Sequence, residues 1–93
     1  FAARFGGDEF AVVLPGTSKT EAFAVAEKIR KAISSLRVSP AGNEVRSVGT
    51  TASIGVASIG GDVTDGLALL GAADRALYAA KQGGRDQVRL ASR

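Results

Sequence analysis

The 93-residue chain contains no cysteine and no histidine. Their absence excludes disulfide bonds, thiolate nucleophiles, zinc sites built from Cys and His, and acid–base catalysis by imidazole. The metal ligands that remain are carboxylate and carbonyl oxygens, which select hard cations. Any metal that this chain binds is therefore expected to be Mg²⁺ or Mn²⁺.

Long apolar runs are also absent. No stretch approaches the roughly 20 apolar residues of a membrane-spanning helix. We therefore expect a soluble domain with no direct membrane contact, located in the cytoplasm either alone or as the cytoplasmic part of a membrane-anchored protein. The length allows one small hydrophobic core, and hence one domain over residues 1–93.

Aromatic residues are scarce, at 5% of the chain, and Tyr78 is the only tyrosine. The net charge of +3 is compatible with a polyanionic partner. However, the basic residues between positions 28 and 37 are preceded by Glu27, and no row of aromatic side chains is available to stack bases. We interpret them as a solvated helix face and expect no nucleic-acid partner. A nucleic-acid-binding module, suggested by the basic composition alone, is the weaker alternative.

The most distinctive segment is RFGGDEF at residues 4–10. Gly6-Gly7 between β-prone residues favours a two-residue hairpin turn, because such turns need backbone conformations that glycine adopts without steric cost. A turn without side chains lets a phosphate or a base approach the main chain. Asp8 and Glu9, at the start of the return strand, are expected to point to opposite faces and suit Mg²⁺. The alternative is a solvated hairpin with ordinary polar turn residues.

A first helix is predicted after this hairpin. Ser18 and Glu21 have the Ser-x-x-Glu spacing of a capping box, which marks the start of a helix. Apolar residues then recur every three or four positions and form one predicted stripe: Ala22, Val25, Ala26, Ile29, Ile33 and Leu36.

Two strands and a second helix are predicted next. The strands cover 44–48 and 51–58, and the second of them has only small side chains on one face, which indicates close packing there. Thr64 or Asp65 is expected to cap a helix that ends at Gly83. The predicted apolar stripe of this helix consists of Leu67, Leu70, Ala73, Leu77 and Ala80. With a last strand over 87–90, the order predicts an α+β fold with a mixed sheet and helices at its faces.

A second group of chemically useful residues lies where this helix ends. Lys81 and Arg85 flank the sequence Gln-Gly-Gly. Lysine contributes a compact charge and arginine a fork that can hold two phosphate oxygens. Cations at a helix C-terminus also interact favourably with the helix dipole, so a purely structural role is the alternative.

Three segments together resemble one family. RFGGDEF at 4–10, TASIGVA at 51–57 and ADRALYAAKQGGR at 73–85 are similar, in order and spacing, to the GGDEF family of bacterial diguanylate cyclases. One departure is Asp86, where the family usually has asparagine after the arginine. We expect this difference to affect a turn more than the chemistry.

The resemblance implies a palm-like α+β fold, related to the ferredoxin-like fold, and the condensation of two GTP molecules to cyclic di-GMP with release of pyrophosphate. It implies a homodimer of domains that share each active site. Asp8 and Glu9 match the family's metal-binding acids, and Asp8 also matches the group proposed to deprotonate the attacking hydroxyl. Lys81 and Arg85 match residues that bind the β- and γ-phosphates, while Gly6 and Gly7 let the nucleotide lie against the hairpin.

The same resemblance predicts that residues 1–93 are only part of a GGDEF domain. The family's first strand and following helices, which carry another metal-binding aspartate and the guanine-reading residues, are expected upstream, after a sensory or receiver domain. We therefore expect the isolated chain to be inactive and poorly stable as a monomer. Lys28 falls where some members place a basic residue of a partner subunit's product-binding surface, but we interpret it as part of the solvated helix face. The functional alternative is a catalytically inactive module that senses GTP or cyclic di-GMP.

Overall fold

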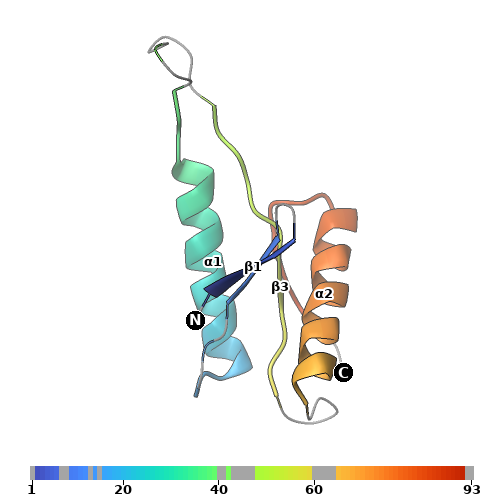
Figure 1. The fold of residues 1–93 in the computed structure, drawn as a ribbon. Coiled ribbons are helices and arrows are strands. Elements are labelled where there is room, and N and C mark those ends of the chain that lie inside the picture. Colours follow the sequence, from blue (N-terminus) through green and yellow to red (C-terminus); the bar gives the residue numbers. More distant parts are fainter. Residues whose placement is uncertain are drawn as a thin grey trace.

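The fold is described from a computed structural model, in which residues 2–6, 9–12, 14, 16–39, 42, 48–59 and 65–91 are described, with the backbone alone for 2–6 and 9–11. The elements in chain order are β1 (Ala2–Gly6), β2 (Glu9–Val12), α1 (Lys19–Ser35), β3 (Ile54–Val56), α2 (Gly66–Gln82) and β4 (Val88–Leu90). Figure 1 shows α1 and α2 on either side of β3. The predicted α+β class is confirmed.

The strands form two separate pairs. β1 and β2 are antiparallel, with Gly6 opposite Glu9 and an irregular register between Arg4 and Gly6. β3 and β4 are parallel, with Ile54 opposite Val88. Both pairing directions expected of a mixed sheet are present, but the described strands form two two-stranded sheets rather than one. Gly6 is the last residue of β1, so the register places it in the strand and not in the turn.

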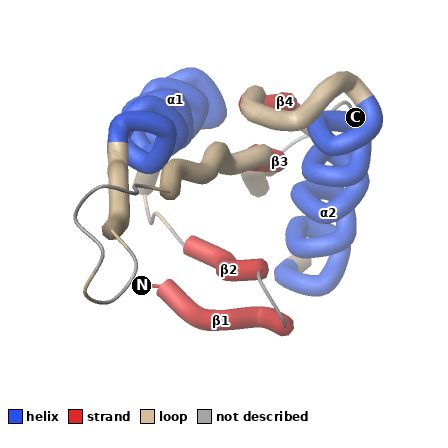
Figure 2. Tube along the Cα trace, turned by 90° about the horizontal axis from the view of Figure 1, so that it is seen from above, coloured by secondary structure: helices blue, strands red, loops and turns tan. Residues whose placement is uncertain are grey.

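The hairpin formed by β1 and β2 lies apart from the other elements. No Cα atom of its two strands comes within 8 Å of a residue in the described helices or in β3 and β4. Figure 2 shows the hairpin on the side of β3 that faces away from β4. The remaining four elements therefore pack as one unit without it.

Both helices begin at the predicted caps. The Ser18 hydroxyl accepts a hydrogen bond from the Glu21 backbone N–H, and the Glu21 carboxylate accepts one from the Ser18 N–H, each at 3.1 Å. Of the two candidates for the second cap, Asp65 is the N-cap of α2 and accepts a hydrogen bond from the Ala68 N–H at 2.8 Å. Both contacts satisfy backbone donors that a helix leaves unpaired at its start.

The buried core consists of small residues, namely Ala26, Val56, Ala72, Ala76 and Ala80. Gly55 explains how α2 approaches β3 so closely. A Cβ atom at this position would overlap the carbonyl oxygen of Ala73 and the backbone of Leu77. The close packing predicted for the second strand is confirmed, and it depends on the absence of a side chain at position 55.

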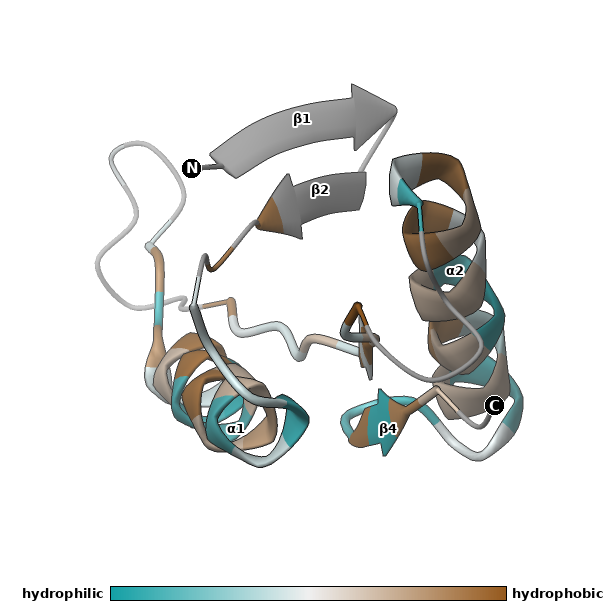
Figure 3. Ribbon diagram, turned by 90° about the horizontal axis from the view of Figure 1, so that it is seen from below, coloured by the Kyte–Doolittle hydropathy of each residue, from teal (hydrophilic) through white to brown (hydrophobic). Residues whose placement is uncertain are grey.

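The predicted apolar stripes are only partly correct. Leu67 is 84% exposed, because the buried face of α2 is centred on the alanines and not on the leucines. On α1, Ile29 is exposed, and Leu36 lies beyond the last helical residue with an extended backbone. Figure 3 shows that hydrophilic and hydrophobic residues occupy different sides of the helices. Neither described helix is long and apolar enough to cross a membrane.

The other predicted strands are shorter than expected or lie outside the described residues. Residues 44–47 are not among those described, and Val48 forms an isolated antiparallel bridge with Val38. Of the strand predicted over 51–58, only β3 is a strand in the structure. Just beyond β4, the Ala91 N–H donates a hydrogen bond to the Val56 carbonyl at 2.7 Å and continues the pairing with β3.

Candidate active site

The described residues of the signature segment lie at the end of β1 and the start of β2. In the strand register, Gly6 of β1 lies opposite Glu9 of β2, so one acid of the signature is paired with a glycine. The backbone of Glu9 is described, whereas Gly7 and Asp8 lie outside the described residues. The register is irregular between Arg4 and Gly6, and interruptions of this kind in a strand pair are common beside functional sites.

The end of α2 is built by a glycine-dependent cap. Gly83 is the C-cap, and Gly84 has a φ of 113°, in the region that favours glycine. The Arg85 N–H donates to the Ala80 carbonyl at 2.9 Å, which is the long hydrogen bond of a Schellman motif. The predicted helix end is confirmed, and the cap places Lys81 in the last turn of α2 and Arg85 just beyond it.

The turn after α2 is braced by side chains. The Gln87 side-chain amide donates to the Gly83 carbonyl at 2.9 Å and to the Arg85 carbonyl at 3.1 Å. Arg89 in turn donates to the Gln87 side-chain oxygen at 2.6 Å. These hydrogen bonds hold the backbone around Arg85, while the Arg85 side chain is exposed to solvent.

One contributor to this region was not singled out from the sequence. The Arg30 Nη1 donates to the Asp86 Oδ1 at 2.9 Å, while its Nε pairs with the Glu27 Oε1 at 2.9 Å. The hydrogen bond from Arg30 lowers the pKa of Glu27, and both carboxylates raise the pKa of Arg30. The i,i+3 spacing of Glu27 and Arg30 is visible in the sequence. No local pattern links Arg30 to Asp86, 56 residues away.

The described parts of the two groups of predicted site residues lie on separate elements, and Gly7 and Asp8 lie outside the described residues. Among the described elements, β1 and β2 approach neither α2 nor β4 within 8 Å between Cα atoms. In the part of the chain that the structure describes, no cluster of three or more potential metal-ligating side chains occurs. The adjacent acids Asp8 and Glu9 still fit Mg²⁺ by donor type, because this ion is commonly held by one or two carboxylates together with substrate phosphates.

Comparison with known proteins assigns the chain to a family. The family described as "Diguanylate cyclase, GGDEF domain" matches residues 1–87. The chain belongs to the GGDEF family. The matched region extends from β1 across α2 to the turn that carries Arg85.

Two curated relatives show the extent of the similarity. Diguanylate cyclase A of Treponema denticola is 43% identical over 89 residues, which cover 96% of this chain and 23% of the relative. Response regulator PleD of Caulobacter vibrioides is 41% identical over 86 residues, covering 91% of this chain and 18% of the relative. The chain thus spans about a fifth of the length of these curated relatives.

A solved GGDEF structure has the same fold. The crystal structure of the GGDEF domain of DgcB from Caulobacter crescentus, in complex with c-di-GMP, superposes with a TM-score of 0.88 at 35% identity. The match covers 98% of this chain and 53% of that chain. The α+β arrangement is therefore that of a GGDEF domain.

Proposed function

We propose that the protein containing this chain condenses two GTP molecules into c-di-GMP, releasing two pyrophosphates, at a site shared by two GGDEF domains. The observation that carries the proposal is the family match over residues 1–87 in a chain that retains the complete GGDEF sequence. The relative from Treponema denticola, which is named a diguanylate cyclase, supports the same reaction class.

In this proposal the two acids of the signature act together. Asp8 and Glu9 hold Mg²⁺ or Mn²⁺, and Asp8 accepts the proton of the attacking 3′-hydroxyl. The metal, when bound, neutralises charge on the phosphoryl group that is being transferred. Gly6 and Gly7 provide a side-chain-free surface against which the nucleotide lies. The pairing of Gly6 with Glu9 supports this arrangement, because it holds the second acid beside a residue that leaves room for a ligand.

Lys81 and Arg85 bind the β- and γ-phosphates of GTP. The cap of α2 supports these two roles, because it places Lys81 in the last helical turn and Arg85 on the braced turn that follows. Because no Cα atom of the described hairpin strands lies within 8 Å of one in α2, the nucleotide itself is proposed to link the two groups. Electrostatic stabilisation of the transferring phosphoryl group then supplies most of the rate enhancement.

Replacement of Asp8 or Glu9 by Ala tests this function. In the full protein supplied with GTP and Mg²⁺, we expect c-di-GMP formation, measured by chromatography, to fall by at least about 10²-fold, as for other lost transition-state contacts. The midpoint of thermal unfolding should stay close to that of the unsubstituted protein, because Glu9 begins β2, outside the unit formed by α1, β3, α2 and β4, and Asp8 directly precedes it in the sequence.

Asp74→Ala is the matched control, since it removes an exposed carboxylate from α2 and should leave the rate unchanged. Substantial c-di-GMP formation by the Asp8→Ala protein would overturn the assignment. An unsubstituted protein that binds GTP or c-di-GMP but forms no product would instead support the alternative function, an inactive sensing module.

A further inference from the structure

The turn that follows α2 contains two consecutive non-glycine residues with left-handed backbone. Arg85 has a φ of 64° and Asp86 a φ of 47°. Such conformations are uncommon for residues with a side chain, although aspartate and asparagine adopt them more readily than most. They persist where surrounding contacts fix them. The turn that presents Arg85 therefore depends on what holds its neighbour, Asp86.

Contacts from two other parts of the chain converge on Asp86. Its backbone N–H donates to the Ser53 hydroxyl, on the segment that leads into β3, at 3.2 Å. Its carboxylate accepts a hydrogen bond from Arg30 of α1 at 2.9 Å. Arg30 is itself fixed by two hydrogen bonds to the Glu27 carboxylate, at 2.9 and 3.2 Å, and its side chain is only 18% exposed.

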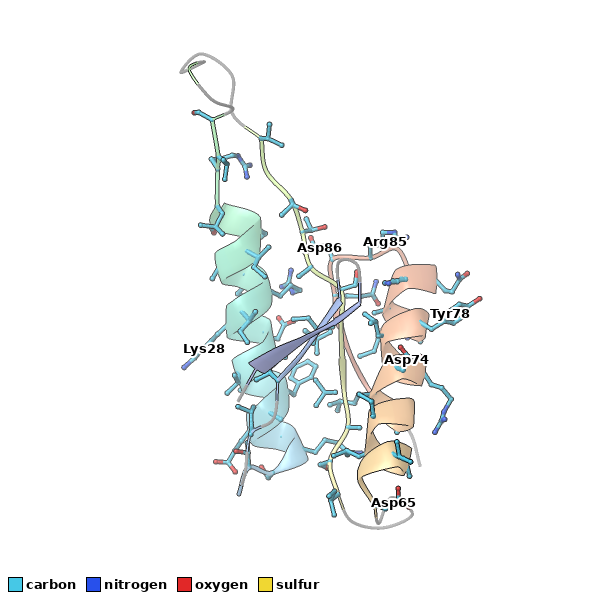
Figure 4. The ribbon with its side chains drawn as sticks, viewed as in Figure 1. Lys28, Asp65, Asp74, Tyr78, Arg85 and Asp86 are labelled. Carbon is cyan, nitrogen blue, oxygen red and sulfur yellow. The ribbon has the colours of Figure 1, made fainter. Side chains whose placement is uncertain are left out.

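The charge of Asp86 matters because of its position. Figure 4 shows Asp86 next to Arg85 on the turn beyond α2, whereas Lys28 points away from α2 on the far side of α1. An unpaired carboxylate beside Arg85 would attract the Arg85 guanidinium and repel an incoming phosphate, because opposite charges attract and like charges repel at short range. In the structure, the Asp86 carboxylate is instead paired with Arg30 of α1.

We propose that Arg30 is a positioning residue for GTP: by engaging the Asp86 carboxylate, it keeps the Arg85 guanidinium available to the phosphates. This inference rests on the proposed function, in which Arg85 binds phosphate. It adds a residue of α1, 56 positions before Asp86 in the chain, to the determinants of substrate binding.

The test compares the KM for GTP and the kcat among variants of the full protein. Arg30→Ala should raise KM by roughly tenfold, within the usual coupling of contacting ionic residues, and change kcat less. The double variant Arg30→Ala/Asp86→Asn should recover most of this loss, because asparagine tolerates the left-handed backbone but carries no charge. Asp86→Asn alone should stay within about threefold of the unsubstituted protein on the same coupling scale.

Lys31→Ala is the matched control, since it removes one exposed positive charge from the adjacent position of α1 and should leave KM unchanged. If Arg30→Ala fails to fold by circular dichroism, Arg30→Gln applies the same test, because it keeps a side-chain donor while removing the charge. A merely structural role for Arg30 would lower the unfolding midpoint without recovery of KM in the double variant.

Arg85→Ala separates failure of this inference from failure of the proposed function. An unchanged KM in Arg85→Ala would overturn the phosphate role of Arg85, and the positioning role with it. If Arg85→Ala raises KM but Arg30→Ala does not, or if the double variant binds GTP as weakly as Arg30→Ala, the positioning role alone is wrong.

Discussion

The hairpin of β1 and β2 and the unit formed by α1, β3, α2 and β4 differ in how they are supported. The strands of the hairpin contact each other but none of the other described elements within 8 Å between Cα atoms. In the unit, α2 lies so close to β3 that Gly55 has no room for a side chain. The proposed metal-binding acids thus belong to the signature segment, and the proposed phosphate-binding cations belong to the unit in which α2 packs closely on β3. Substitutions in the two regions should therefore have different consequences.

The largest effect on stability is expected in the packed unit, at Gly55. Gly55→Ala would place a methyl group against backbone atoms of Ala73 and Leu77, which cannot move aside as a flexible side chain can. We expect a loss of about 2–3 kcal/mol in the free energy of unfolding, measured by denaturant titration. Activity should fall only in proportion to the unfolded fraction.

Gly71→Ala is the control, and it should raise the free energy of unfolding where Gly55→Ala lowers it. Its added methyl group would meet only the Arg75 side chain, at 3.5 Å, and alanine favours a helix interior by up to about 1 kcal/mol over glycine. A Gly55→Ala protein as stable as the Gly71→Ala protein would show that the contact between β3 and α2 is looser than described.

A difference in kinetic parameters should separate the two groups of site residues. Lys81→Ala should raise the KM for GTP by about tenfold and lower kcat less, because a phosphate contact made in the ground state contributes to binding. Glu9→Ala should mainly lower kcat. Steady-state kinetics of the full protein would check this, and an equal loss of kcat in both variants would contradict the division of roles.

The N-cap of α2 should contribute a smaller amount. Asp65→Ala removes the acceptor of the Ala68 N–H and is expected to cost about 1 kcal/mol in the free energy of unfolding. Asp65→Asn, which retains a side-chain acceptor, is the control and should be nearly neutral. An effect of Asp65→Asn as large as that of Asp65→Ala would mean that the side-chain hydrogen bond is not the cause.

The smallest expected effect is a dependence of stability on pH through α1. Hydrogen bonds from Ser18 lower the pKa of Glu21 below its ordinary value of 4.5, and the hydrogen bond from Arg30 lowers that of Glu27. The folded chain therefore binds these protons more weakly than the unfolded chain. The resulting stabilisation is present above pH 4.5 and is lost as the pH falls through the lowered pKa values.

Unfolding midpoints recorded from pH 6 to pH 3 would measure this loss. Glu21→Gln and Glu27→Gln should each flatten the dependence, since glutamine does not titrate. If the curves of both variants run parallel to that of the unsubstituted protein, these two acids do not contribute to the pH dependence.

The predictions from sequence succeeded where the determinants are local. Ser18 and Glu21 are three residues apart and form the predicted capping box, and Asp65 caps α2 as one of two candidates. The end of α2 follows from Gly83 and Gly84 in the same way. In each case a backbone group is satisfied by a residue a few positions away, so the sequence contains the whole interaction.

Features that depend on tertiary packing were not predictable in this way. A period of three or four residues does not distinguish a stripe centred on leucines from one centred on alanines. In the structure the buried residues of α2 are Ala72, Ala76 and Ala80, while Leu67 is exposed. The ion pair of Arg30 with Asp86 joins elements that only the fold brings together. The roles of Asp8, Glu9, Lys81 and Arg85 remain predictions, since they depend on a nucleotide.

The parallel pairing of β3 and β4 has a consequence for the order of folding. The antiparallel hairpin can close through two residues, but the whole of α2 must be traversed before Val88 can pair with Ile54. Closure of such a distant pair carries a large entropic penalty before any hydrogen bond is gained, which makes parallel pairing slow. β4 should therefore dock only after α2 has packed on β3, and the turn carrying Arg85 should be among the last parts of the chain to acquire its final geometry.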